Sequence, residues 1–191
     1  MRVLIACEFS GIVRDAFKAR GHDAWSCDLL PTEREGWHIQ GDVLSRLADG
    51  WDLMIAHPPC THLAVSGAAW FARKQKEQAE ALDFVRALMD APIAKICIEN
   101  PVSVISSRIR KPDQIIQPWM FGHAERKTTC LWLKGLPPLI PTTNLKAETD
   151  AKPKAQQNPL HYLPPSAERW KKRSTTYQGI ADAMAAQWGE V

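Results

Sequence analysis

The sequence lacks any long hydrophobic run: nothing in its 191 residues approaches the roughly 20 apolar residues that cross a bilayer. Its five cysteines form no Cys-x-x-Cys pair, and its six histidines are scattered without the spacing of metal ligands. Glycine is sparse, and neither a G-x-G-x-x-G motif nor a P-loop is present. We therefore expect no membrane span, no metal site, and neither a dinucleotide site nor a P-loop nucleotide site.

The chain also lacks a strong charge of either sign. Its net charge is only +3, while hydrophobic residues make up 45% and charged residues 24%, as in an ordinary globular domain. Between Lys134 and Arg173, basic residues outnumber acidic ones. This region could neutralise phosphates or could be an ordinary solvated surface, and charge alone does not separate the two readings.

Short apolar runs alternate with amphipathic stretches, the pattern of a parallel sheet flanked by helices. The expected strands cover residues 3–7, 24–29, 39–43, 51–56, 95–98 and 129–133. The expected helices cover residues 11–20, 74–89 and 179–188. The predicted fold class is α/β, with a mostly parallel sheet and helices on both faces.

Prolines punctuate residues 135–165 and forbid long regular structure there. We interpret this stretch as a surface excursion from one domain that spans residues 1–191. Glu8 interrupts the apolar run near the N-terminus, which favours a buried strand over a secretion signal. An odd number of cysteines also fits a reducing compartment, so we expect a cytoplasmic protein.

Two reactive side chains follow neighbouring predicted strands. Cys60 comes after Pro58-Pro59, just beyond the fourth predicted strand, and Glu99 comes just beyond the fifth, followed by Asn100. Ligands of an open parallel sheet bind beyond the carboxyl ends of its strands, so both side chains should emerge at one edge. The other four cysteines lie in apolar runs, where a cysteine is usually a small buried hydrophobe. The pairing favours a nucleophilic thiol with an acidic partner.

The first three predicted strands end in residues suited to a nucleotide-like ligand. The first runs into a turn and then a helix, a usual place for such a ligand. That turn consists of Glu8, Phe9, Ser10 and Gly11. Asp28 ends the second strand, where an acid can accept hydrogen bonds from a ribose, and Asp42 ends the third, suited to an adenine amino group. Taken singly, each acid could be a cap or a surface residue.

In this order along most of the chain, these residues resemble the motifs of the DNA cytosine-C5 methyltransferases, specifically the short, divergent forms of phages and prophages. The specific part of the resemblance is Pro58-Pro59-Cys60 followed at the right interval by Glu99-Asn100. The resemblance implies a Rossmann-like fold, S-adenosylmethionine as cofactor, and DNA as substrate. The cytosine would be flipped out of a duplex or presented in a single strand.

The resemblance also implies a role for each site residue. Cys60 would add to C6 of cytosine as a thiolate, making C5 electron-rich, and Glu99 would bind the N3 and amino edge of the ring. Asn100 would orient the catalytic loop. The catalytic set is Cys60, Glu99, Asn100, Pro59 and Lys127, and the cofactor set is Glu8, Phe9, Ser10, Gly11, Asp28, Asp42, Pro58 and Tyr177.

Several positions depart from the family pattern. Ile12 follows Gly11 where the family has further glycines, and His57 replaces a glycine before the prolines. Glu125-x-Lys127-x-Thr129 stands where the family has Gln-x-Arg-x-Arg, so the contact of Lys127 with the target nucleotide should be looser than that of an arginine. If protonated, His57 and His62 would lower the pKa of Cys60.

The sequence leaves other functions open. Between Thr129 and Tyr177 there is no room for a full target-recognition domain, so specificity should be relaxed or supplied by a protein partner. The substrate could then be single-stranded DNA or a free cytosine nucleotide, and the transferred group could differ from methyl. Amino-methyltransferases place an aromatic residue where Cys60 stands, which favours carbon methylation here. The alternative from another class is a non-catalytic module that binds DNA or protein.

Overall fold

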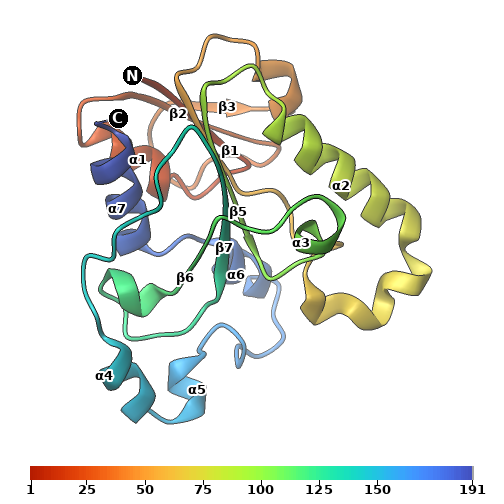
Figure 1. Ribbon diagram of the computed structural model, residues 1–191, viewed down its shortest axis with the longest axis vertical. Coiled ribbons are helices and arrows are strands. Elements are labelled where there is room, and N and C mark those ends of the chain that lie inside the picture. The colour runs from red at the N-terminus through yellow and green to blue at the C-terminus, as the bar shows by residue number, and fades with distance from the viewer. Residues whose placement is uncertain (191) are drawn as a thin grey trace.

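A seven-stranded sheet forms the centre of the computed structural model, which describes residues 1–190 except for the side chain of Trp70 (Figure 1). The strands are β1 (Arg2–Ala6), β2 (Asp23–Asp28), β3 (His38–Gln40), β4 (Leu53–Ala56), β5 (Lys95–Pro101), β6 (Gln114–Ile116) and β7 (Thr129–Lys134). Their order across the sheet is β3-β2-β1-β4-β5-β7-β6. Neighbours from β3 to β5 are parallel, whereas β7 runs antiparallel to both β5 and β6. The predicted α/β class with a mostly parallel sheet is confirmed.

Helices cover both faces of the sheet. The helices are α1 (Ile12–Lys18), α2 (Gln75–Met89), α3 (Ile105–Arg108), α4 (Lys146–Ala151), α5 (Lys154–Gln157), α6 (Arg169–Ser174) and α7 (Gln178–Trp188). Short 3₁₀ helices are η1 (Val43–Arg46), η2 (Val65–Arg73) and η3 (Pro118–Phe121). Figure 1 shows α1 and α7 together on one side of the sheet and α2 on the other.

The central strands are apolar throughout because both of their faces are buried. Successive side chains of a strand point to opposite faces, so the core divides into two layers. In β1, Val3 and Ile5 pack in the layer with α1 and α7, while Leu4 and Ala6 pack in the layer with α2. No described helix is long and apolar enough to cross a membrane.

Outside the central strands, the structure departs from the sequence prediction in several places, among them β6 and α3, which were not predicted. The third strand ends at Gln40, and Asp42 instead caps η1 by accepting a hydrogen bond from the N–H of Leu44 at 2.9 Å. A carboxylate at this position satisfies a free amide of the following turn, which ends the extended conformation. The proline-rich stretch contains α4 and α5, and the chain then returns through α6 to the edge of the sheet (Figure 1).

Candidate active site

The candidate site lies where the strand order reverses, at the carboxyl ends of β1 and β4. β2 lies on one side of this pair and β5 on the other, so the chain leaves the two strands in opposite directions. The backbone N–H of His57 donates to the carbonyl of Ala6 at 2.9 Å and ties the two strand ends together. Open α/β sheets bind their ligands in the crevice at this point.

Cys60 stands exposed in the loop after β4, held by a tight turn. Its carbonyl accepts hydrogen bonds from the N–H groups of Leu63 and Ala64 at 3.0 and 2.9 Å. Partial desolvation and the negative charge of Glu99 raise the pKa of the Cys60 thiol, and the positive charges of Arg173 and Lys127 oppose this rise. The two cations that lower this pKa come from α6 and from the chain before β7, and the part expected of protonated His57 and His62 stays a prediction.

Glu99 is the first residue of β5 beyond the pairing with β4. We expected it just after the strand, but β5 continues to Pro101 because Glu99 and Asn100 pair with β7. The Oε2 atom of Glu99 lies 3.0 Å from Nδ1 of His57, and the side chain is 12% exposed. Burial raises the pKa of Glu99, but the hydrogen bond from His57 and the charge of Lys127 outweigh it, so the pKa lies below its usual value. Glu99 is therefore an ionised carboxylate.

Asn100 joins the strand to the catalytic loop. Its Nδ2 donates to the carbonyl of Pro58 at 2.8 Å, and the side chain is buried. Pro58 itself is buried, while Pro59 is exposed next to Cys60. This hydrogen bond links β5 to the loop after β4, the two segments that carry Glu99 and Cys60.

Lys127 and Tyr177 form the wall of a narrow cavity beside Glu99. Nζ of Lys127 donates to the carbonyl of Thr175 at 3.2 Å and lies 5.9 Å from the centre of the Tyr177 ring. The Tyr177 hydroxyl donates to Glu125, and burial together with that carboxylate raises the pKa of Tyr177 far above its usual value. The cavity is lined by Glu99, Lys127, Thr129, Thr176, Tyr177 and Ile180.

Glu8 folds back onto the helix that follows it. Its carboxylate accepts hydrogen bonds from the N–H groups of Val13 and Arg14 at 2.7 and 3.2 Å and from the Ser10 hydroxyl at 3.2 Å. Burial raises the pKa of Glu8, while the nearby His57 and these hydrogen bonds oppose the rise. Both oxygens are thus engaged inside the protein, so Glu8 shapes the turn rather than facing a ligand directly.

Gly11 and Phe9 lie in the same turn, and both residues are buried. Gly11 has a φ of 72°, and a Cβ there would come within 2.5 Å of Nη2 of Arg14, so no larger residue fits without a shift. Phe9 is 7% exposed and packs its ring 5.5 Å from that of Trp170 in α6. The helix α6 therefore covers this turn.

Asp28 and Asp42 approach each other at the ends of β2 and β3. Oδ1 of Asp28 accepts from the N–H of Leu30 at 2.9 Å, much as Asp42 caps η1. The Oδ2 atom of each has no hydrogen-bond partner among the described residues. Both aspartates act on Cys7, which follows the neighbouring β1: the pKa of Cys7 is raised strongly, first by burial and then by Asp28, Cys27 and Asp42. These two oxygens can accept hydrogen bonds from a ligand.

Three features of the site were missed from the sequence. Cys7, which we took for an ordinary buried strand residue, has a φ of 58°, the one positive φ among described non-glycine residues, and marks the sharp turn after β1. Arg173 acts on the thiol from α6. His57 bridges the site through its bond to Glu99. No signal in the sequence separated Arg173 from its basic neighbours, whereas His57 stood out as a departure from the family pattern.

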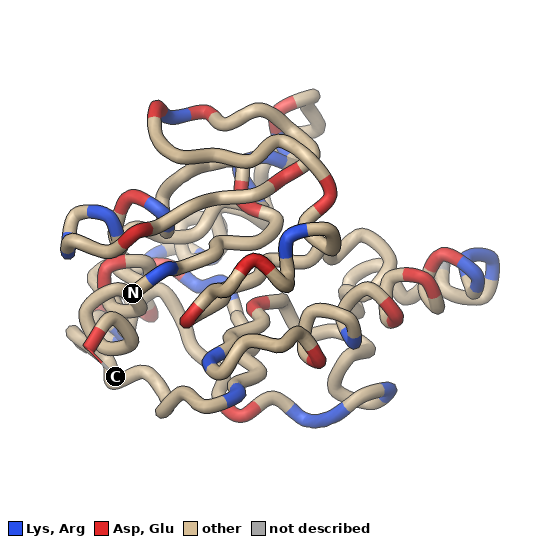
Figure 2. Tube along the Cα trace, turned by 90° about the horizontal axis from the view of Figure 1, so that it is seen from above, with Lys and Arg blue, Asp and Glu red and all other residues tan. Residues whose placement is uncertain are grey.

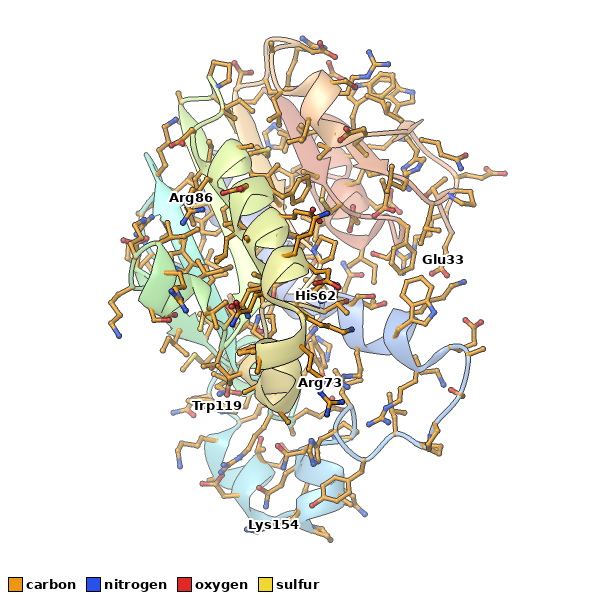
Figure 3. All side chains as sticks on the ribbon, turned by 90° about the vertical axis from the view of Figure 1, so that its right-hand side faces the viewer. Glu33, His62, Arg73, Arg86, Trp119 and Lys154 are labelled. Atoms are coloured by element: carbon orange, nitrogen blue, oxygen red, sulfur yellow. The ribbon has the colours of Figure 1, made fainter. Side chains whose placement is uncertain are left out.

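Ion pairs neutralise part of the predicted basic region. Lys146 binds Asp150 at 2.7 Å, and Lys152 lies 3.8 Å from Glu148. Lys171 binds Glu33 at 3.1 Å, and Figure 3 shows Glu33 close to α6. Acidic and basic residues are also interspersed along the whole trace (Figure 2). Within the described residues, no group of His, Cys, Asp or Glu side chains could hold a metal ion.

Comparisons with solved structures find several similar chains. No family model and no curated protein matches the sequence. The fold is similar to the crystal structure of an E. coli protein encoded within a prophage, whose provisional name is DNA modification methyltransferase. The two share 17% identity with a TM-score of 0.41, over 69% of this chain and 45% of that one. This chain thus matches less than half the length of that protein, and the likeness does not establish a shared activity.

Proposed function

We propose that the protein transfers a methyl group from S-adenosylmethionine to C5 of cytosine in DNA through a covalent bond between Cys60 and C6. One observation carries the proposal: an exposed thiol lies within the electrostatic reach of a buried, ionised carboxylate where the strand order reverses. A thiol and an acid at one crevice suit addition of sulfur to a ring whose other edge is held by hydrogen bonds.

Glu99 would receive the Watson–Crick edge of cytosine. Its carboxylate accepts a hydrogen bond from the exocyclic amino group, and a proton taken up from solvent as the base binds is shared between this carboxylate and N3. Sharing that proton also neutralises Glu99. Because the charge of Glu99 raises the pKa of Cys60, base binding lowers that pKa and leaves Lys127 and Arg173 to favour the thiolate. Glu99 thus couples recognition of the base to activation of the thiol.

Cys60 would then add to C6, and the proton shared at N3 would balance the charge placed on the ring. S-adenosylmethionine supplies the methyl group that C5 receives. Loss of the C5 proton and departure of Cys60 restore the aromatic ring and free the enzyme. Asn100 would hold the loop in place during these steps through its bond to Pro58.

The residues beyond β2 and β3 fit the cofactor. The unpaired Oδ2 atoms of Asp28 and Asp42 can accept hydrogen bonds from ribose hydroxyls and from an adenine amino group. Phe9 lies in the same region, buried under Trp170 in the turn after β1. We infer that these residues hold the adenosine part, with the sulfonium end toward β4.

The substrate is proposed to be a cytosine outside a base stack, because a stacked base cannot reach a thiol in such a crevice. Duplex DNA with a flipped base and single-stranded DNA both satisfy this requirement. A protein partner would supply sequence specificity. Three lysines of the C-terminal third, Lys146, Lys152 and Lys171, already have acidic partners, which reduces the positive charge that this part of the chain can offer to DNA.

The test is transfer of labelled methyl from S-adenosylmethionine to duplex DNA, single-stranded DNA and dCMP. Wild type and Cys60→Ser run side by side, with products analysed as nucleosides. We expect 5-methylcytosine from wild type alone. An oligonucleotide with 5-fluorocytosine should also trap wild type as a covalent adduct, because fluorine cannot leave C5 as a proton does. Cofactor binding without transfer to any substrate would overturn the proposal.

The second candidate is a non-catalytic module that binds DNA or protein. The raised pKa of Cys60 and the cover of α6 over Phe9 favour it. This candidate predicts neither cofactor binding nor adduct formation, so the same experiment separates the two functions.

A further inference from the structure

His57 stands at the centre of the site, yet the proposed reaction gives it no part. It follows β4 directly, and its N–H bonds to Ala6 at the end of β1. Its side chain is 8% exposed. The carboxylate of Glu99 in β5 lies beside it. The carboxylate of Glu8, in the turn after β1, is close enough for His57 to lower its pKa electrostatically. His57 therefore lies between the base edge and the cofactor turn.

The two ring nitrogens of His57 have different partners. An ionised carboxylate only accepts hydrogen bonds, so Nδ1 must carry the proton that it shares with Oε2 of Glu99 at 3.0 Å. The Nε2 atom is buried and has no hydrogen-bond partner among the described residues. Buried polar atoms are nearly always paired, so this nitrogen is a contact point for a ligand in the crevice.

The direction of Nε2 follows from the shape of the ring. The two nitrogens of an imidazole point to nearly opposite sides, so a ring with Nδ1 on Glu99 turns Nε2 away from β5. Glu8 lies nearby, but no hydrogen bond joins it to Nε2, and its oxygens accept from Val13, Arg14 and Ser10 instead. The Nε2 atom is thus left for whatever binds at the turn after β1.

We propose that His57 is a positioning residue that links the cofactor to Glu99. Its Nε2 hydrogen-bonds the amino-acid part of S-adenosylmethionine, and its Nδ1 fixes the Glu99 carboxylate against the base. This inference rests on the proposed function for the identity of the ligands. It assigns to His57 a contact with the amino-acid part and none with the adenosine part, which Asp28 and Asp42 would hold.

Two substitutions separate the nitrogens. His57→Asn places an amide near Nδ1 and removes Nε2, whereas His57→Gln reaches toward Nε2 and gives up the contact with Glu99. Binding is measured by calorimetry with S-adenosylhomocysteine and with 5′-methylthioadenosine, which lacks the amino-acid part. We expect His57→Asn to weaken binding of S-adenosylhomocysteine about tenfold, as loss of one hydrogen bond to a charged group does, and to leave methylthioadenosine unchanged. Equal effects on both ligands, or none, would overturn the inference.

Ring-nitrogen NMR tests the same assignment without turnover. In wild type, the Nδ1 signal of His57 should be that of a protonated nitrogen and should shift in Glu99→Gln. S-adenosylhomocysteine should shift Nε2 of His57 and leave His161, in the loop after α5, unchanged. An Nε2 signal that does not respond to a bound ligand contradicts the proposal. Thermal melts of each variant show whether it is folded.

Turnover supplies a third readout. His57→Gln should lower kcat about 100-fold with little change in KM for the cofactor, because a misplaced Glu99 costs rate rather than affinity. His57→Asn should mainly raise that KM. Failure of the proposed function gives a different result. If wild type binds no S-adenosylhomocysteine, both the proposed function and the role of His57 are overturned. Binding that His57→Asn leaves intact overturns only the role of His57.

Discussion

At the scale of single residues, the thiol and the carboxylate of the site control each other through their charges. The pKa of Cys60 is raised by desolvation and by Glu99 and is held back by Arg173 and Lys127. The ionised state of Glu99 depends on His57 and Lys127. A substitution at one of these positions therefore changes the protonation of another residue through the electrostatic field, without replacing that residue.

The first prediction concerns alkylation of Cys60 by iodoacetamide as a function of pH. Only the thiolate reacts, so wild type should be modified half-maximally above the pH of an ordinary thiol. Glu99→Gln removes a negative charge and should shift this midpoint down, whereas Arg173→Gln removes a positive charge and should shift it up. Mass spectrometry of the Cys60 peptide gives the rates.

Asp49→Asn is the matched control, because Asp49 is an exposed acid that pairs with Arg46. It should leave the midpoint where wild type has it. A midpoint that rises in Glu99→Gln would contradict the electrostatic coupling.

At the scale of elements, α1 is anchored by two buried charged residues at its N-terminal end. Glu8 accepts from its first free amides, and Arg14 is fully buried within the helix. The Arg14 guanidinium donates to the carbonyls of Arg34 and Glu35 and to the hydroxyl of Ser26. The helix thereby holds the loop between β2 and β3 in place.

We expect Arg14→Met to lower the free energy of unfolding by about 3 kcal/mol, because it leaves several buried acceptors unpaired. Arg34→Met, at an exposed arginine 3.7 Å from Asp15, should cost less than about 0.5 kcal/mol. Urea denaturation followed by tryptophan fluorescence measures both. Equal losses in the two variants would contradict the structural role of Arg14.

The element α6 is held by few contacts, chiefly Trp170 on Phe9 and Lys171 on Glu33. Trp170→Ala should therefore increase the rate of tryptic cleavage in α6 about fivefold, since an aromatic pair contributes about 1 kcal/mol. Trp37→Ala removes a different aromatic pair, with Trp25, and serves as the control. Unchanged cleavage in Trp170→Ala would show that other contacts hold the helix.

At the scale of the whole molecule, stability is concentrated in the centre of the sheet. β1 and β4 are buried on both faces, whereas α4 and α5 lie apart from the sheet (Figure 1). We expect amide hydrogens of Leu4 and Ile55 to exchange most slowly and those of residues 146–157 to exchange fastest by orders of magnitude. Exchange followed by mass spectrometry measures this, and uniform protection would contradict it.

Much of this arrangement could be predicted from the sequence, because apolar runs and their order decide which strand ends meet. The shared edge of Cys60 and Glu99 followed from that order alone. What could not be predicted depends in part on pairing between distant segments, since β7 extends β5 past Glu99. Asp42 caps η1, which begins at Val43, the last residue of the expected third strand. Likewise, no sequence pattern around Glu8 indicates that its carboxylate accepts hydrogen bonds from the backbone of α1, because these N–H groups are brought to it only when the helix has folded.

The packing of α7 against α1 has a consequence for synthesis on the ribosome. Val13 and Phe17 of α1 share one core layer with Ile180 and Trp188, which follow every strand in the chain. A nascent chain that has completed every strand still presents this apolar side of α1 to water until α7 emerges. Such a chain exposes an apolar surface that is prone to aggregation, so translation must pass Trp188 before this core layer can close.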